Sequence, residues 1–400
     1  MKMKTKEKPW LIVLRILLAA VFLFSGFTKA IDPIAFAIKI DEYFISFGIG
    51  FFHPFSMFIA VMMIILEFSL GFMLLFRIYV KFTSIMYLLF MLFFFFLTLW
   101  LAVAEYLEVN YGYNFGVVKD CGCFGKAIKL SNFDTFLKNV GIMIPTLIIF
   151  FKRKSIPEVR LTTFGRFSVI TVGVLIVAGI EFYSYRHLPI IDFSDWKKGA
   201  NIVELFIDKP AQKNIVFIYQ NNTDSSKVIL SEDELTSITD SIPDFYDKYQ
   251  YVDRKDSVTI KAIQPKIAGF NMVDSLGADH SFELINNDED QILLLMFMHD
   301  LDEVKLEFFK DKDFKVLLDS CQKNGIALVG ITNSSPESIS SFKIMNEVSI
   351  PIYYNQIDPI KGPFMVRDAL HANPGLILLK KGVVIDKWSW RDVPSFEEIN

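Results

Sequence analysis

The sequence predicts a multi-pass α-helical membrane bundle followed by an α/β domain outside the membrane. Hydrophobic residues make up 52% of the 400 residues, which exceeds the roughly 45–50% of ordinary soluble chains. The excess lies before residue 187, and beyond it Asp, Lys, Ser and Asn alternate with apolar residues as in soluble domains. The formal net charge of −4 gives no indication of nucleic-acid binding.

Apolar runs long enough to cross a bilayer predict the spanning helices. A span needs roughly 17–25 mostly apolar residues. A cleaved signal peptide is the alternative for the first run, but this run continues to about Phe27 without a small-residue cleavage site, which favours a retained helix. We therefore expect five spanning helices, at 10–30, 54–76, 80–104, 133–151 and 163–186.

The charges that flank these runs predict the orientation. The N-terminus and the second and fourth connections are basic, whereas the first and third connections are mostly acidic. By the positive-inside rule the N-terminus is cytoplasmic, and the third connection and residues 187–400 lie outside, in the periplasm of a bacterial inner membrane. The basic residues are Lys2, Lys4, Lys6, Lys8, Arg77, Lys81, Lys152, Arg153, Lys154 and Arg160, and the acidic residues are Asp32, Asp41, Glu42, Glu105, Glu108 and Asp120.

Two of the three cysteines lie in the third connection, in the stretch DCGCFG at 120–125. Cys121 and Cys123 can form a disulfide if the backbone bends, which Gly122 permits, and the small strained ring suits thiol exchange in an oxidising compartment. The alternative is a glycine-rich turn with two unreactive thiols. Zinc would require two further ligands nearby, but Cys321 is distant and the five histidines are scattered, so no metal site is predicted.

Ionisable residues inside the predicted spans mark a second candidate site. Arg15 lies in the first span and Glu67 near the middle of the second, and we expect them to form an ion pair. Gly71, one turn beyond Glu67, allows the two helices to approach closely. In a purely structural alternative, Lys29, near the outer end of the first span, extends to the membrane interface. These residues either fix helix register or take part in quinone-side or proton-handling chemistry.

The first-span pattern R-x9-SG-x2-K-x2-DP-x2-FA and the CGCFG stretch resemble the DoxX/MauE superfamily of membrane proteins, and CGCFG is most similar to its MauE branch. The resemblance covers the four helices at 10–151 and implies a redox-associated membrane protein. MauE-like proteins are thought to assist disulfide formation in a periplasmic partner, and DoxX relatives are linked to thiosulfate–quinone chemistry, which makes quinone the one cofactor candidate. The matching residues are Arg15, Ser25, Gly26, Lys29, Asp32, Pro33, Phe36, Ala37, Glu67 and Gly71.

The part of the chain outside the membrane begins with a β-rich segment and continues with an α/β pattern. Alternating stretches such as Asn214–Tyr219, Lys227–Leu230 and Val258–Ala262 predict the β-rich segment. Beyond it the order is a buried strand, a helix, a second buried strand and a terminal hairpin. The expected elements are strands at 291–298 and 326–331, a helix at 302–324, and a hairpin at 376–380 and 383–388.

This order is that of thioredoxins, and two details are similar to TlpA-type thioredoxin-like proteins. Phe270, Asp274 and Gly277 resemble their entry strand and turn, and Pro374 occupies the place of the cis-proline loop. The catalytic CxxC is missing, because His299-Asp300 follows the first strand where the thiols would stand. Thiol exchange requires a thiol nucleophile, so this domain is not an ordinary thioredoxin, and Cys321 is interpreted as a helix-packing residue.

The sequence leaves two functions open. One is an inner-membrane accessory redox protein, in which Cys121 and Cys123 exchange electrons with a periplasmic protein that the thioredoxin-like domain recognises. The other is a non-enzymatic assembly or scaffold protein. A transporter has little support, because the spans show no internal repeat. The expected parts are a four-helix membrane domain at 1–155, a fifth helix and linker at 156–187, the β-rich segment at 188–266 and the thioredoxin-like domain at 267–400.

Overall fold

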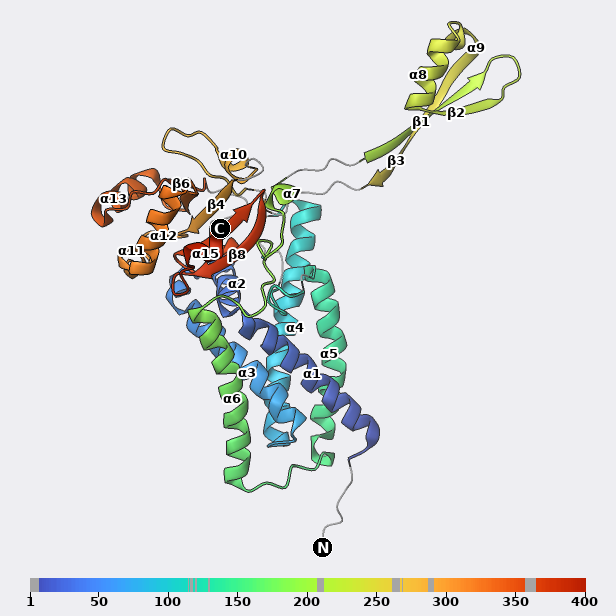
Figure 1. The fold of residues 1–400 in the computed structure, drawn as a ribbon. Coiled ribbons are helices and arrows are strands. Elements are labelled where there is room, and N and C mark those ends of the chain that lie inside the picture. The colour runs from blue at the N-terminus through green and yellow to red at the C-terminus, as the bar shows by residue number, and fades with distance from the viewer. Residues whose placement is uncertain are drawn as a thin grey trace. The chain divides into compact units, whose positions relative to one another are not determined.

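The computed structural model of the chain forms two compact units, residues 1–200 together with 270–400, and residues 201–269. Lys2, Lys4, Lys6, Asp120 and the end of the predicted strand at 258–262 lie outside the described residues. The structure describes residues 7–113, 115, 118, 121–128, 130–206, 212–260, 267, 269–286, 291–356 and 365–400 (Figure 1).

Within the described residues, five helices are long and apolar enough to cross a membrane, which confirms the predicted multi-pass bundle. Figure 1 shows them packed side by side. The 3-10 turn η1 (Gly50–Phe55) precedes the second span, and η2 (Arg153–Ser155) follows the fourth. The spanning helices are α1 (Pro9–Ile31), α3 (Ser56–Leu75), α4 (Val80–Tyr111), α5 (Asn132–Lys152) and α6 (Thr163–Arg186).

Two glycines set the distance between α1 and α3. A Cβ atom added to Gly26 would lie 2.9 Å from the Cβ of Phe68, and one added to Gly71 would lie 2.9 Å from the Cβ of Phe22. A side chain at either position would collide with the neighbouring helix, so the helices touch where the glycines lie. The close approach expected at Gly71 is confirmed. A second close approach places Gly26 opposite Phe68.

The first connection contains a helix that the sequence analysis did not predict, α2 (Pro33–Ser46). Asp32 caps its N-terminus by accepting a hydrogen bond from the Ala35 amide (3.0 Å), and Pro33 occupies the first helical position. A capping Asp followed by Pro is a typical helix start. The helix buries Phe36 and Ile40 against the bundle and positions Tyr43 beside the third connection.

Both ends of the third connection have defined helix-terminus conformations. Helix α4 stops at Gly112, whose φ of +70° suits glycine. Ser131 caps α5 by accepting a hydrogen bond from the Asp134 amide (3.1 Å), and the Asn132 side chain donates to the Val118 carbonyl (3.0 Å). The cysteine turn therefore lies in a loop that is anchored to the bundle.

The C-terminal region is an α/β structure around a five-stranded mixed sheet of order β6-β5-β4-β7-β8. Strands β4, β5 and β6 are parallel, and β7 and β8 are antiparallel to their neighbours. The strands are β4 (Ile292–Phe297), β5 (Ala327–Thr332), β6 (Ile352–Tyr354), β7 (Gly375–Lys380) and β8 (Val383–Ser389).

The helix expected at 302–324 is wrong in its first part. Residues 298–306 lie outside any helix, and Asp311 ends one short helix and caps the next by accepting from the amides of Asp313 and Phe314. Asp is favoured at such caps because its side chain replaces the missing backbone acceptor. The helices of this region are α10 (Ser281–Ile285), α11 (Glu307–Lys310), α12 (Lys312–Lys323), α13 (Pro336–Asn346), α14 (Met365–Ala369) and α15 (Phe396–Ile399).

The second unit is a small antiparallel sheet of order β2-β1-β3. Tyr219, Leu230 and Phe245 form its core. The strands expected from the alternation at 214–219 and 227–230 are present. Its elements are α7 (Ile202–Phe206), β1 (Gln212–Asn221), β2 (Lys227–Ser231), α8 (Glu232–Ser241), α9 (Phe245–Lys248) and β3 (Tyr249–Ile260).

Candidate functional site

The two cysteines of the third connection lie against each other. The Sγ atoms of Cys121 and Cys123 are 2.8 Å apart, and both residues are free thiols. Gly122 between them has a φ of +66°, and a Cβ there would lie 2.8 Å from the Cγ of Lys39. Glycine is therefore required both by the backbone conformation and by the neighbouring helix. Cys121 is buried and Cys123 is partly exposed.

Hydrogen bonds from two helices hold the backbone of this turn. The Ser25 hydroxyl on α1 donates to the Cys123 carbonyl (2.6 Å), and the Tyr43 hydroxyl on α2 donates to the Cys121 carbonyl (3.3 Å). The Phe124 ring packs near the ring of Phe24, also on α1. The turn is thus positioned by the bundle, and its two sulfur atoms have a defined surrounding.

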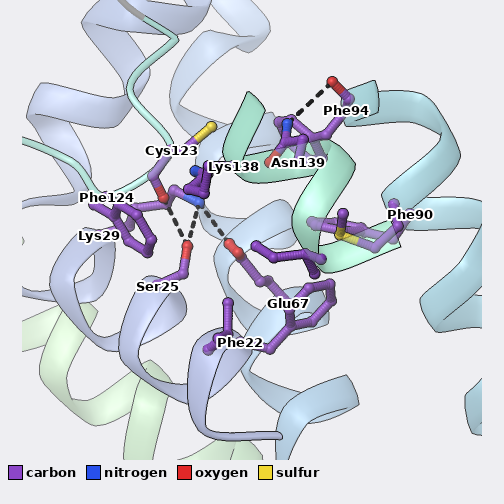
Figure 2. A pocket seen from close by; sticks show the side chains of 13 residues that line it. Phe22, Ser25, Lys29, Glu67, Phe90, Phe94, Cys123, Phe124, Lys138 and Asn139 are labelled. Carbon is purple, nitrogen blue, oxygen red and sulfur yellow. Dashed lines mark hydrogen bonds and ion pairs between the residues drawn. The ribbon is translucent and has the colours of Figure 1, made fainter. Parts of the chain in front are cut away.

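A buried ion pair lies directly beneath the turn (Figure 2). The Lys29 ammonium donates to Glu67 Oε2 (2.6 Å) and to the Ser25 hydroxyl (3.1 Å). The side chains of Lys29 and Glu67 are 2% and 7% exposed, so both charges are shielded from water. Each charge is compensated by the other. Ser25 contacts both the ammonium and the Cys123 carbonyl, which links the ion pair to the cysteines.

The expected pair between Arg15 and Glu67 is wrong. The glycine contacts place Glu67 near the level of Gly26, three residues from Lys29 but eleven from Arg15, about 16 Å along the helix. The alternative in which Lys29 extends to the interface is not what the structure shows, because the Lys29 ammonium pairs with Glu67 inside the bundle. The error came from counting helix rise from the cytoplasmic ends without knowing the register.

Arg15 instead stabilises the other end of the bundle. Its guanidinium donates to the Leu74 and Leu75 carbonyls (3.1 and 2.7 Å) and pairs with Glu7 (2.9 Å). The last carbonyls of a helix have no partner within it, so Arg15 satisfies two such groups of α3. We assign Arg15 a structural role.

A small cavity of about 30 Å³ adjoins Cys123 and the ion pair (Figure 2). This volume is about that of one water molecule. The cavity beside the thiols is therefore too small for a quinone ring in this arrangement. The polar residues around the cavity are Ser25, Lys29, Glu67, Cys123, Lys138 and Asn139.

The surroundings give the two thiols opposite acidities. The hydrogen bond from Cys121, supported by the charges of Lys138 and Lys29, lowers the pKa of Cys123 to about 6 against the opposing effect of burial. The same hydrogen bond, together with burial, raises the pKa of Cys121 well above its usual range. Cys123 is therefore the thiolate at neutral pH and Cys121 the thiol that donates to it.

Sequence reasoning missed Lys138, although its position signals a role. It lies two turns into α5, inside a predicted span, where a lysine is unusual. Its ammonium lies 4.3 Å from the centre of the Phe124 ring and lines the cavity that contains Cys123. Tyr43 was also missed, because its helix was not predicted.

The candidate residues of the C-terminal region form contacts within that region. The Asn373–Pro374 peptide bond is cis, and the Asn373 side chain donates to the Asp300 carbonyl (2.8 Å). Burial, aided by nearby positive groups, lowers the pKa of His299 to about 3, so its ring is neutral. Cys321 lies in the core on α12, and burial raises its pKa to about 11.

Metal binding finds no support in the described part of the chain, where no three His, Cys, Asp or Glu side chains gather in a suitable arrangement.

Comparison with known proteins gives one match, to a family model. No curated protein and no solved structure matches the chain. Residues 8–152, which contain α1 to α5 and the cysteine turn, match the family model described as methylamine utilisation protein MauE. The membrane part of this chain is therefore MauE-like.

Proposed function

We propose that the chain is an inner-membrane accessory protein whose Cys121–Cys123 pair exchanges disulfides with a periplasmic protein. The observation that carries the proposal is the sulfur pair itself, with its 2.8 Å separation and a Cys123 pKa of about 6. A lowered pKa increases the thiolate fraction at neutral pH, and the thiolate is the nucleophile of exchange. The MauE-like membrane part supports an accessory role.

The exchange proceeds through Cys123. Its thiolate attacks one sulfur of a partner disulfide, which forms a mixed disulfide and releases one partner thiolate. Cys121 then loses its proton and attacks the Cys123 sulfur, which releases the second partner thiolate. The Cys121–Cys123 pair is oxidised by two electrons and the partner is reduced by two. The same steps in reverse oxidise a partner dithiol, so partner redox state sets the direction.

The C-terminal domain is the proposed recognition element, with a thioredoxin-like fold. The parallel pair β4–β5 followed by the antiparallel hairpin β7–β8 supports this fold. The loop before β7 contains Pro374, as the resemblance implies. His299 follows β4 in place of a cysteine, so this domain contributes binding without exchange. That substitution also favours the second candidate function, a non-enzymatic scaffold whose cysteine turn is a structural clip.

The proposed orientation places the cysteine turn and the C-terminal domain in the periplasm. The basic fourth connection and the acidic first connection support it. A reporter enzyme that is active only in the periplasm, fused after Asn400, should be active. Activity of a cytoplasm-only reporter at the same position would reverse the orientation and remove the oxidising compartment on which the exchange depends.

Trapping the mixed disulfide tests the exchange. Cys121→Ser removes the thiol that resolves the intermediate, so Cys123 should accumulate in a disulfide-linked complex with a partner, visible on non-reducing gels and lost on reduction. Cys123→Ser is the matched control and should trap little, because Cys121 is buried and its pKa is raised. Absence of a reducible complex in both variants would favour the scaffold.

A further inference from the structure

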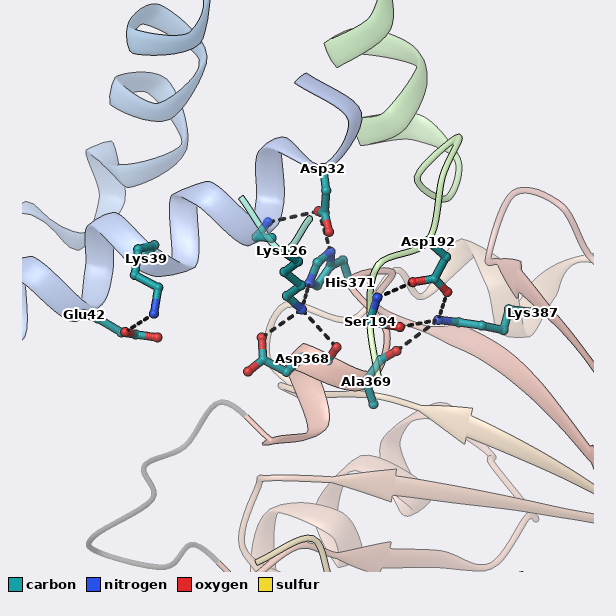
Figure 3. Close-up of polar contacts among 11 residues, drawn as sticks. Asp32, Lys39, Glu42, Lys126, Asp192, Ser194, Asp368, Ala369, His371 and Lys387 are labelled. Carbon is teal, nitrogen blue, oxygen red and sulfur yellow. Dashed lines mark hydrogen bonds and ion pairs between the residues drawn. The ribbon is translucent and has the colours of Figure 1, made fainter. Parts of the chain in front are cut away.

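Three side chains in the stretch 367–371 of the C-terminal domain contact polar side chains of the membrane domain (Figure 3). Asp368 pairs with Lys126 (3.2 Å), and His371 pairs with Asp32 (2.8 Å). Arg367 lies 3.8 Å from Asp41. Arg367 and Asp368 each lie near an opposite charge, and the His371 ring contacts Asp32 through Nδ1 and the Lys126 ammonium through Nε2 (3.3 Å). We call residues 367–371 the docking segment.

The contact between Asp32 and His371 is shielded from water, because their side chains are 13% and 7% exposed. The contact between Lys126 and Asp368 is partly exposed, because the two side chains are 19% and 47% exposed. Burial opposes charge on Lys126, but Asp368 and Asp32 outweigh it and raise the pKa of Lys126. Burial likewise opposes charge on Asp32, but His371, Lys126 and the Ala35 amide together lower the pKa of that carboxyl. Each charge therefore depends on its partner across the contact.

The docking segment lies against the cysteine turn. Lys126 is three residues beyond Cys123, in the same series of turns. Asp368 lines a cavity of about 120 Å³ together with Gly122 and Gly125. Asp368 of the C-terminal domain therefore reaches the side of the turn on which Gly122 packs against α2.

A second set of contacts secures the docking segment within its own domain. The Lys387 ammonium on β8 donates to the Ala369 carbonyl (3.2 Å) and to Asp192 (2.7 Å) (Figure 3). Asp192 lies in the stretch that follows α6. The Lys387 ammonium therefore joins the docking segment to the stretch that leads out of the last spanning helix. The segment is fixed between the sheet and the bundle.

We infer that the C-terminal domain is a built-in cover of the cysteine turn, held by the docking segment, and that a partner protein reaches Cys123 when the Lys126–Asp368 and Asp32–His371 contacts open. The reference to a partner rests on the proposed function, whereas the cover itself does not. The domain then controls access to the thiols as well as recognising the partner.

The test measures access to one thiol in the full-length protein. In a Cys121→Ser/Cys321→Ser background under reductant, Cys123 is labelled separately with a maleimide carrying a large polyethylene glycol chain and with N-ethylmaleimide. The ratio of the two rates reports steric access, because a change in the Cys123 pKa affects both reagents alike. The variants are Lys126→Asp, Asp368→Lys and the two together, and the control is Lys198→Asp, whose partner Asp386 belongs to an exposed pair.

Each single reversal places like charges together at this contact and should raise the ratio about tenfold, whereas the control should not change it. The charge-swapped double variant restores opposite charges between positions 126 and 368 but leaves a carboxylate near Asp32, so it should return the ratio only to within about threefold of the parent. A ratio that is the same in all variants overturns the inference, and so does a swap that stays as open as the singles. Labelling under reductant requires no exchange activity, so this result is independent of the trapping experiment.

Discussion

The chain contains two thiol environments, and they differ in almost every physical respect. Cys121 and Cys123 lie together in a loop beside Lys29 and Lys138, and the pKa of Cys123 is lowered to about 6. Cys321 lies alone among apolar side chains, and its pKa is raised to about 11. The comparison shows that reactivity follows from a donor and nearby cations, since a buried thiol without them stays protonated.

The same contrast holds for the two buried cations of α1. Arg15 binds helix-end carbonyls and Glu7, far from any thiol, whereas Lys29 pairs with Glu67 directly beneath the cysteine turn. Both residues are buried and lie on one face of the helix, yet one stabilises an end of the bundle and the other belongs to the candidate site. Position relative to the turn, and not charge alone, separates the two roles.

Of the changes that separate the two roles, removal of Glu67 should have the largest effect on the stability of the protein. Glu67→Ala leaves the Lys29 ammonium buried without a counter-charge, which we expect to lower the stability of the protein in detergent by about 3–5 kcal/mol. Lys29→Met/Glu67→Ala together should recover much of that loss, because no charge is stranded. Asp386→Asn, at an exposed pair, is the control and should cost about 1 kcal/mol or less. Strict additivity of the Lys29 and Glu67 changes in unfolding experiments would show that the two do not interact.

The pH dependence of alkylation should distinguish Cys123 from Cys321, with a smaller effect than the loss of stability expected for Glu67→Ala. Only the thiolate reacts, so after mild reduction the rate of Cys123 modification by iodoacetamide should rise as pH increases through about 6, the pKa of this thiol. Lys138→Met removes a cation and should move the midpoint upward, whereas Lys138→Arg should retain it. Cys321, read by mass spectrometry in the same samples, should stay unmodified. A Cys123 midpoint near the value of an ordinary cysteine, about 8.5, would contradict the assignment.

Much of the fold could be predicted from the sequence, because the positions of the spanning helices and of the buried strands depend on the distribution of apolar residues. The five spans follow from apolar runs, and the buried strands β4 and β5 follow from continuous apolar stretches. Helix α2 was missed because its apolar residues were read as part of a connection, although Asp32-Pro33 is a recognisable helix start. Tyr43, which holds Cys121, could not be placed without that helix.

The candidate site was predicted in its members but not in its pairings. Cys121, Cys123, Lys29 and Glu67 were selected from residue type and depth alone, but the partner of Glu67 depends on the register of α1 against α3. Gly26 and Gly71 fix that register through close contacts, and spacing along one chain contains no information about it. Contacts between distant segments, such as that between Asp32 and His371, were likewise outside the reach of sequence patterns.

The redox state of the cysteine turn in native membranes tests the central claim most directly. Membranes are treated with a mass-tagged maleimide, with and without prior mild reduction, and each cysteine is read separately. Tagging is carried out after unfolding, because Cys121 and Cys321 are buried in the folded protein. If Cys121 and Cys123 are an exchanging pair, both should be protected without reductant and tagged when reduction precedes unfolding, while Cys321 should be tagged in either case. Full tagging of both loop cysteines without reductant would contradict the redox assignment and leave the scaffold function in its place.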